Sequence, residues 1–184
     1  MTEKFSYELK VPKERVAVLI GKSGEIKKQI ESETHTFIQI DSKEGEVAIL
    51  GEDALGLYSA KEIVRAISRG FNPDYALLLL KHDYAFEMFN ITDYAGKQKN
   101  SMQRLKGRVI GKEGKARRII EELSEVHICV YGKTIGIIGE IENVSIARRA
   151  IESLLTGSPH SNVYKWLEKR RKDLKVKEML EKEI

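Results

Sequence analysis

The sequence has little cysteine, little proline and no long apolar run, and these shortages exclude several classes of protein. Its single cysteine, Cys129, rules out an intramolecular disulfide, so the chain is not a disulfide-stabilised extracellular scaffold. The longest aliphatic run, from Ala76 to Leu80, is far shorter than the roughly 20 residues that span a bilayer. The first residues contain no apolar signal-peptide segment. We therefore expect a cytoplasmic protein without a membrane partner.

Residues that carry enzyme chemistry are also scarce or scattered. No Gly-X4-Gly-Lys-Ser/Thr motif for nucleotide hydrolysis occurs, and no carboxylates cluster as they do in metal-dependent nucleases. Tyr131 and Trp166 have rings that could stack on bases, but core packing is the ordinary role of such rings. We expect no metal, no other cofactor and no enzymatic activity. The histidines do not follow a zinc-binding spacing; they are His35, His82, His127 and His160.

Positive charge is concentrated in one part of the chain. The net charge is +4, yet residues 1–70 carry −1 and residues 71–184 carry +5. Between residues 97 and 118, nine lysines and arginines stand against one acid, Glu113. A charge run alone is typical of a solvated helix face. Because this run surrounds a glycine loop, it favours a phosphate-binding surface instead.

One short motif occurs twice. Ile-Gly-Lys-Ser-Gly at 20–24 returns as Ile-Gly-Lys-Glu-Gly at 110–114, an offset of 90 residues. A repeat of this period indicates a duplicated structural unit. We therefore predict a first module at residues 1–70, a linker with a short helix at 71–83, a second module at 84–158 and a C-terminal helix at 159–184.

Hydrophobic periodicity gives the element order of the first repeat. Alternating apolar residues predict strands, whereas apolar residues three or four apart predict helices. The order is β-α-α-β-β-α, which makes the fold class α+β. The predicted elements are a strand at 5–11, helices at 13–20 and from 25, strands at 36–40 and 47–50, and a helix at 54–68 capped by Asp53.

The second repeat follows the same order. Two helices lie outside the repeat, one in the linker and one at the C-terminal end. The predicted elements are a linker helix at 74–81, a strand at 84–92, helices at 101–110 and 115–124, strands at 127–131 and 134–138, a helix at 144–155 and a C-terminal helix at 162–183.

A Gly-Lys-X-Gly turn between two helices suits a phosphate backbone. Glycine allows a sharp reversal and a close approach of another chain, because it has no side chain. The helix that starts at the turn offers unpaired N–H groups and the positive end of its dipole to an anion. Lys22 and Lys112 add mobile positive charge. A single copy of such a turn is common, but two copies in one structural frame are a specific signal.

Apolar residues near each loop are expected to form the floor of a groove for unstacked bases, and basic residues to bind its phosphates. A groove of this width admits one strand, not a duplex. In the first module the predicted RNA-binding residues are Gly21, Lys22, Ser23, Gly24, Lys27, Ile20, Ile38 and Ile40; in the second they are Gly111, Lys112, Glu113, Gly114, Lys115, Arg108, Lys106, Arg117, Arg118, Val109, Ile110, Ile128 and Val130.

With these motifs the chain resembles a tandem KH-domain protein over about residues 5–70 and 84–157. The resemblance implies two type I KH modules, each with a three-stranded antiparallel sheet packed on three helices, plus extra helices between the modules and at the C-terminus. In KH modules the glycine loop clamps about four nucleotides of single-stranded RNA or DNA.

The second module resembles one family more closely. Residues 105–115, Ile138-Gly139, Ala147-Arg148, 154–159 and Tyr164 are similar to the small-subunit ribosomal RNA assembly factors. The eukaryotic member is called partner of Nob, or Dim-two, and the short chain here resembles the archaeal form. The resemblance implies binding near the 3′ end of small-subunit rRNA. It also implies two partners, a Nob-type endonuclease and an initiation-factor subunit.

Three alternatives remain open at the level of sequence. The chain could be a KH protein of RNA degradation or of mRNA regulation, or a protein-docking scaffold that no longer binds RNA. In eukaryotic relatives the first glycine loop is often degraded, whereas here it is intact. Because the first module is slightly acidic, we expect the second module to be the primary RNA site and the first to be auxiliary or to bind a protein.

Overall fold

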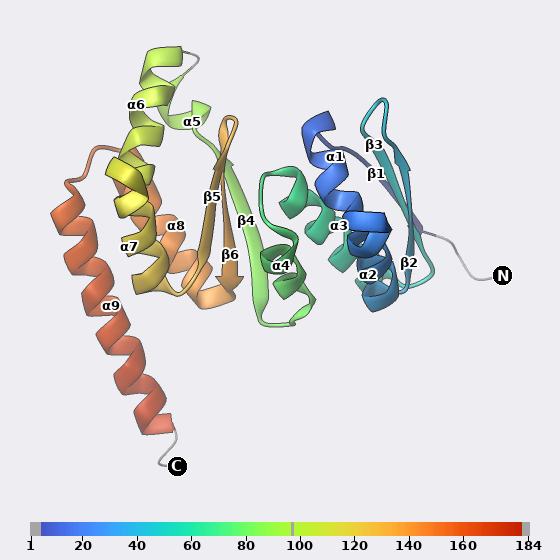
Figure 1. Ribbon diagram of the computed structural model, residues 1–184. Helices are drawn as coiled ribbons and strands as arrows, with labels where there is room; N and C mark the ends of the chain where they lie inside the picture. The colour runs from blue at the N-terminus through green and yellow to red at the C-terminus, as the bar shows by residue number, and fades with distance from the viewer. Residues whose placement is uncertain (1–4, 97, 182–184) are drawn as a thin grey trace. The chain divides into compact units, whose positions relative to one another are not determined.

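The computed structural model describes residues 5–96 and 98–181. Contacts divide the chain into two compact units, one that extends to Phe86 and one that begins at Glu87. Each unit holds one three-stranded antiparallel sheet with helices packed on it (Figure 1), which confirms the predicted α+β class. Within the described ranges, no helix is both long and apolar enough to cross a membrane.

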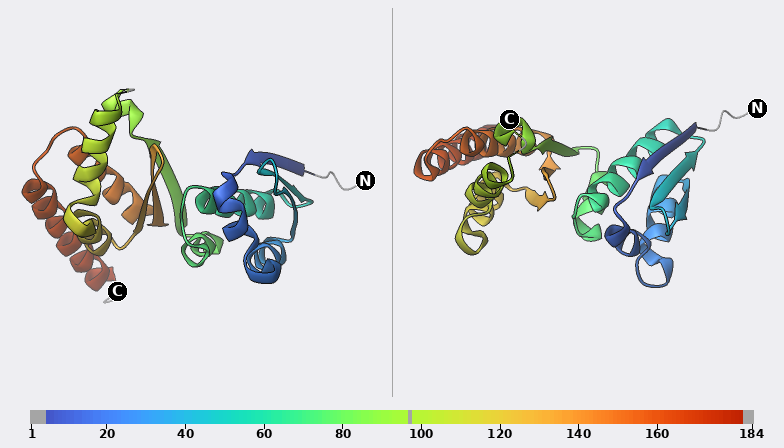
Figure 2. Two further views of the ribbon diagram at one scale, coloured as in Figure 1. Left: turned by 45° about the horizontal axis from the view of Figure 1, so that its top comes forward. Right: turned by 90° about the horizontal axis from the view of Figure 1, so that it is seen from above.

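The first module has the predicted order of elements. Its middle strand pairs antiparallel with both neighbours, so that Ile49 lies opposite Tyr7 on one side and Ile38 on the other. The helices cover one face of this sheet (Figure 2). The elements are β1 (Phe5–Lys10), α1 (Lys13–Ile20), a 3-10 turn (Lys22–Gly24), α2 (Glu25–Thr34), β2 (Thr36–Asp41), β3 (Glu46–Gly51) and α3 (Ala54–Ser68).

The core of this module lies between the sheet and the helices. Val47 and Ile49 alternate with solvent-facing residues along β3, as half-buried strands require, and pack in the core with Ile63 and Ile67 of α3. The predicted cap is confirmed: an Asp53 carboxylate oxygen accepts a hydrogen bond from the Gly56 amide at 2.7 Å. This bond satisfies one of the unpaired N–H groups at the start of α3.

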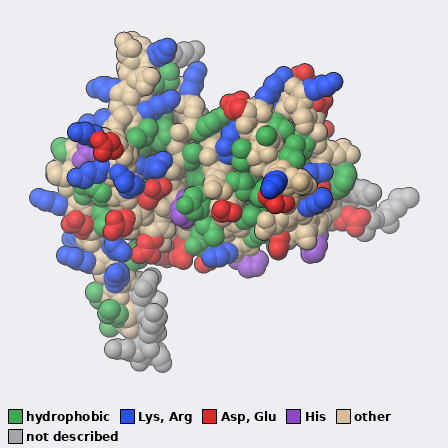
Figure 3. Space-filling model, viewed as in Figure 1, with side chains coloured by type: hydrophobic (Ala, Val, Ile, Leu, Met, Phe, Trp, Pro, Cys, Tyr) green, Lys and Arg blue, Asp and Glu red, His purple; other side chains and the backbone are tan. Residues whose placement is uncertain are grey.

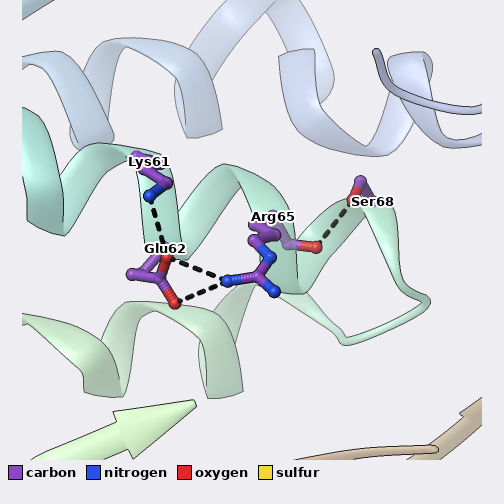
Figure 4. Close-up of polar contacts among 4 residues, drawn as sticks. All are labelled: Lys61, Glu62, Arg65 and Ser68. Carbon is purple, nitrogen blue, oxygen red and sulfur yellow. Dashed lines mark hydrogen bonds and ion pairs between the residues drawn. The ribbon is translucent and has the colours of Figure 1, made fainter. Parts of the chain in front are cut away.

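Helix α3 also carries a buried carboxylate. Glu62 is 7% exposed, and its charge is neutralised on the same helix by Arg65 at 3.3 Å and Lys61 at 3.9 Å (Figure 4). The Ser68 hydroxyl donates to the Arg65 carbonyl at 2.7 Å. Removing both cations would leave the buried carboxylate uncompensated, which is strongly unfavourable.

The linker helix differs from the prediction. A single helix was expected over 74–81, but the chain forms α4 (Pro73–Ala76) followed by a 3-10 turn (Leu77–Leu80). Pro73 fits the first helical turn because it needs no amide partner there. The Asn72 side chain accepts from the Asp74 amide at 3.1 Å and caps this turn. Ala76 and Leu79, three residues apart, are both buried, which is compatible with the three-residue period of the 3-10 turn.

The second module repeats the order and adds helices. Its sheet has the strand order β4-β6-β5, equivalent to the β1-β3-β2 order of the first. The elements are β4 (Tyr84–Asn90), α5 (Thr92–Ala95), α6 (Lys99–Ile110), a 3-10 turn (Lys112–Gly114), α7 (Lys115–Ser124), β5 (His127–Tyr131), β6 (Thr134–Glu140), α8 (Ile141–Leu155) and α9 (His160–Glu181).

Boundaries of this module differ from the predictions by up to three residues: α8 begins at Ile141 rather than 144, α9 begins at His160 rather than 162, and β6 ends at Glu140 rather than 138. The predicted strand 84–92 ends at Asn90, because buried Ile91 donates its amide to the Lys133 carbonyl at 2.9 Å and starts the short helix α5. Helix α6 begins at Lys99, two residues before the predicted start. Lys97 of the basic run, and residues 182–183 of the predicted C-terminal helix, lie outside the described residues.

Helix α9 packs against α7 and α8 rather than standing alone (Figures 1 and 2). Val163 and Leu167 of α9 are buried in the core of the second module. Farther along the helix, Arg171 pairs with Glu125 after α7 at 3.7 Å. The His160 ring nitrogen lies 2.8 Å from the Arg108 carbonyl, so the start of α9 is tied to the end of α6.

Candidate nucleic-acid interface

The two glycine loops have the same backbone geometry. Gly21 has φ 74° and ψ 178°, and Gly111 has φ 73° and ψ 175°. The third loop residue is left-handed in each copy, Ser23 with φ 54° and Glu113 with φ 53°. The agreement of both copies shows that the repeated motif specifies one backbone path.

The first glycine of each loop allows a close approach of the following helix. A Cβ atom at Gly21 would lie 2.5 Å from Ile26 Cγ1, and one at Gly111 would lie 2.7 Å from both Ala116 Cβ and the Ala116 amide nitrogen. Real Cβ contacts are not that short. In addition, this combination of φ and ψ is almost exclusive to glycine. This position is therefore fixed by the fold.

The second glycine faces open space. A Cβ atom at Gly114 would have no heavy atom within 4 Å, and one at Gly24 would meet only Lys28 Cε at 3.8 Å. Each of these glycines is the residue before a ten-residue helix, α2 or α7. The amides of Glu25 and Lys115 donate to the Lys22 and Lys112 carbonyls within the turn, so each helix start offers a second backbone the positive end of its dipole. This position is available for a ligand.

Cations surround both loops. Lys22, Lys112 and Lys115 are exposed, as the prediction that they meet phosphates requires. The exposed Arg118 donates from Nη2 to the carbonyl of Glu113 at 2.9 Å and so braces the loop while remaining at its surface. Lys106 is half-buried on α6.

Arg108 is not placed at the groove, which corrects its predicted role. Its Nε donates to the Leu154 carbonyl at 2.8 Å and its Nη2 to the Ser158 carbonyl at 2.6 Å. The guanidinium is therefore engaged with the end of α8 and the segment before α9. Arg15 forms the equivalent bonds in the first module, to Ile67 at 2.9 Å and Phe71 at 2.6 Å.

The apolar residues predicted to line the groove divide into two groups. Ile38 and Val109 are fully buried and Ile128 is 4% exposed, so their side chains belong to the core and offer no surface to a base. This corrects their predicted direct contact. Their side chains pack in the core beneath the groove, and nearby residues of the same elements are the ones that reach its surface. The partly exposed residues are Ile20, Ile40, Ile110 and Val130.

Edge strand β2 is tied to helix α2 by a residue that the sequence analysis missed. Glu31 accepts the amide of Ile38 at 2.7 Å, and Glu121 accepts the amide of Ile128 at 2.8 Å in the second module. Each carboxylate also pairs with the cation four residues earlier at 3.6 Å. These cations are Lys27 and Arg117, both predicted RNA-binding residues. The offset of 90 residues between the two sets was the available signal.

The same edge offers a further pair of backbone groups. Alternate residues of a strand direct their amide and carbonyl to the same side. Because the Ile38 amide points away from β3 to Glu31, the backbone groups of Ile40 point the same way. In the second module Val130 has the equivalent place after Ile128. These edge groups can hydrogen-bond to a base.

Two further properties of the second module bear on its chemistry. Burial lowers the pKa of His127 on β5, and the Glu121 carboxylate opposes this shift in part. Among the described residues, no three His, Cys, Asp or Glu side chains gather into a metal site. The described interface thus consists of backbone amides, cations and apolar surface.

Comparisons with known proteins agree with this geometry. A model of the eukaryotic-type KH domain, KH-domain type I, built on the second module of PNO1, matches residues 85–172, and the general KH domain model matches residues 6–66. A KH domain-containing protein of Methanocaldococcus jannaschii is 51% identical over 91% of this chain and 74% of its own length.

Two further relatives are named for RNA. The pre-rRNA-processing protein PNO1 of Yarrowia lipolytica is 36% identical over 61% of this chain, which spans only 44% of that relative. A chain in the crystal structure of an a/eIF2alpha-aDim2p-rRNA complex from Pyrococcus horikoshii superposes with a TM-score of 0.85 at 47% identity, covering 92% of this chain and 96% of that chain. The chain therefore belongs to the family of tandem KH-domain proteins that includes PNO1 and archaeal Dim2p.

Proposed function

We propose that this protein binds single-stranded RNA and acts in ribosome assembly near the 3′ end of small-subunit rRNA. One observation carries the proposal: both glycine loops have the same open geometry, with exposed lysines beside a glycine that faces empty space. The relatives support the pathway, since PNO1 is named for pre-rRNA processing and Dim2p was crystallised with rRNA. The role is binding, not catalysis.

The groove binds its ligand by two kinds of contact. The positive end of the α7 dipole and the ammonium of Lys112 hold the phosphates, which is the main source of affinity. Ile110 and Val130 offer apolar surface to unstacked bases, and the edge of β5 reads their polar groups. The second module is the primary site, because the dense basic run surrounds its loop. The first module is auxiliary.

The proposed protein partners are a Nob-type endonuclease and an initiation-factor subunit. The Dim2p relative was crystallised with a/eIF2alpha, which supports the second of these. In this role the bound protein holds the rRNA end in a defined conformation for the endonuclease. Pull-down of the endonuclease by the chain, with and without rRNA, tests whether that contact is direct.

Binding of fluorescent RNA by loop variants tests the function. Lys112→Asp with Glu113→Asp is expected to weaken binding of a 3′-terminal small-subunit rRNA fragment by tenfold or more, because it replaces the loop ammonium by a second carboxylate. Lys22→Asp with Ser23→Asp is expected to cost less. A reversed order would overturn the ranking of the modules.

The RNA controls separate the alternatives. The 3′-terminal fragment should bind more tightly than scrambled RNA of equal length, and its affinity should fall with salt. Equal affinity for every RNA would support a general role in RNA degradation or mRNA regulation. No binding to any RNA at low salt, together with tight binding of a protein partner, would favour a docking scaffold and would overturn the proposal.

A further inference from the structure

A row of lysines lies on the solvent-facing side of α9. Lys165, Lys169 and Lys172 are all exposed and follow one another at intervals of four and three residues, which places them on one side of the helix. The opposite side carries Val163 and Leu167 in the core. The row thus extends about 10 Å along the helix axis.

The stretch around this row is strongly basic. Residues 165–175 contain six lysines and arginines but only two acids, Glu168 and Asp173. Figure 3 shows Lys and Arg side chains gathered over α6, α7 and α9 on the same side of the second module, with fewer Asp and Glu among them. Such a patch attracts a polyanion electrostatically over the whole of this surface.

An aromatic groove lies beside the lysines. Trp166 of α9 is partly exposed, and the guanidiniums of Arg149 and Arg170 lie 5.3 Å and 5.8 Å from its ring centroid. These three residues and Ile146 line a groove of about 610 Å³ between α8 and α9. This volume is within the range of sites that hold small planar ligands. Indole and guanidinium planes are both surfaces on which bases stack.

The start of α9 lies close to the glycine loop of this module. His160, the first residue of α9, contacts the Arg108 carbonyl three residues before Gly111. Helix α9 then runs beside α7, the helix that starts at the loop, as far as the pairing of Arg171 with Glu125. A strand leaving the loop therefore meets the start of α9 first.

We propose that α9 and the adjoining face of α8 form a second contact for single-stranded RNA, which extends the footprint of the second module beyond the loop. The lysine row holds phosphates, and the groove at Trp166 receives a base. The acids Glu142 and Asp173 at the groove rim accept hydrogen bonds from base amino groups. This inference rests on the proposed function, since it concerns the same RNA.

Trp166 provides a direct readout because it is the only tryptophan in the chain. Two nested RNAs are titrated, one of about five nucleotides that fills a single KH groove and one of about 20 nucleotides that reaches α9. The longer RNA is expected to quench Trp166 fluorescence, and the shorter is not. Lys165→Glu, Lys169→Glu and Lys172→Glu together should weaken binding of the longer RNA by about tenfold and reduce its salt slope by about two.

The controls isolate this contact from the loop. The charge-reversed α9 variant should bind the short RNA as the unaltered chain does. A variant with Lys10→Glu and Lys13→Glu, two exposed lysines of the first module, should bind the longer RNA nearly normally. Unchanged affinity of the α9 variant for the longer RNA, or no quenching, would overturn the inference while leaving the proposed function intact.

Three other outcomes would also be decisive. If a poly-glutamate peptide left Trp166 fluorescence unchanged and competed with the longer RNA no better than sodium chloride of equal ionic strength, the RNA assignment would stand. If the peptide quenched Trp166 and the longer RNA did not, the surface would be a site for an acidic protein. Failure of both RNAs to bind the unaltered chain would instead overturn the proposed function.

Discussion

Arg108 donates from Nε to the carbonyl of Leu154 at 2.8 Å, which joins the helix before the second glycine loop to the end of α8. The first module joins the equivalent carbonyl, that of Ile67, to Arg15. Arg15 precedes its loop glycine by six residues, whereas Arg108 precedes its own by three. The two modules thus place an arginine on the same carbonyls from positions one helical turn apart.

Arg108→Ala is expected to destabilise the second module by about 2 kcal/mol, because two partly buried carbonyls lose a charged donor. RNA affinity should change little at temperatures where the variant is folded. Urea unfolding of the chain measures the first effect and RNA titration the second. Arg104→Ala on the exposed side of α6 is the control and should be nearly neutral. A large loss of affinity with unchanged stability would return Arg108 to the RNA site.

The two glycines of one loop are expected to differ in their tolerance of a methyl group. Gly111→Ala should cost about 3 kcal/mol, from a strained backbone and from contact with Ala116. Gly114→Ala should cost about 1 kcal/mol, since only its left-handed backbone is strained. Gly114→Ala should instead reduce RNA affinity, because its methyl group occupies the open space. Equal unfolding free energies for the two variants would contradict this assignment.

The residue after α2 is left-handed without being glycine. His35 has φ 52° and ψ 40°, and it is exposed. His35→Gly is therefore expected to raise the unfolding free energy by about 1 kcal/mol, because it relieves the backbone strain of a side chain in this region. Glu33→Gly inside the same helix should lower it by about 1 kcal/mol. Thermal unfolding of both variants checks the opposite signs.

His127 is expected to make the second module sensitive to acid. Its folded pKa lies below the ordinary 6.5, mainly because burial disfavours the charged form. The unfolded chain therefore binds more protons than the folded one between these two pKa values. The free energy of unfolding that the neutral His127 contributes is fully present above pH 6.5 and is lost as the pH falls through the folded pKa. His127→Gln should flatten the unfolding free energy over this interval, and a slope equal to that of the unaltered chain would refute the assignment.

The glycine loops could be predicted from the sequence because the repeat supplied an internal comparison. Two copies of Ile-Gly-Lys-X-Gly in one frame indicated a common backbone, and Gly21 and Gly111 do agree within a few degrees. The strands and the main helices could be predicted from hydrophobic periodicity, because both repeats show the same order of apolar patterns. Local pattern and tertiary environment point to the same structure in these segments.

Other features depended on contacts that no local pattern encodes. The partners of Arg108 lie 46 and 50 residues away, so its basic character suggested phosphate while its bonds are structural. Ile38 and Ile40 both follow the strand alternation, yet one is buried and the other partly exposed near the strand end. The difference depends on how far each residue lies from the end of the strand, which periodicity alone does not show.

The carboxylates of Glu31 and Glu121 have a consequence for how the protein behaves in concentrated solution. Each occupies an outward amide on the outer strand of a sheet, Ile38 in one case and Ile128 in the other. Such strands are the places where separate molecules add to each other's sheets and aggregate. Because the carboxylate already accepts this amide, the amide cannot pair with an incoming strand, so the same residue that aligns the groove also blocks one hydrogen bond of edge-to-edge association.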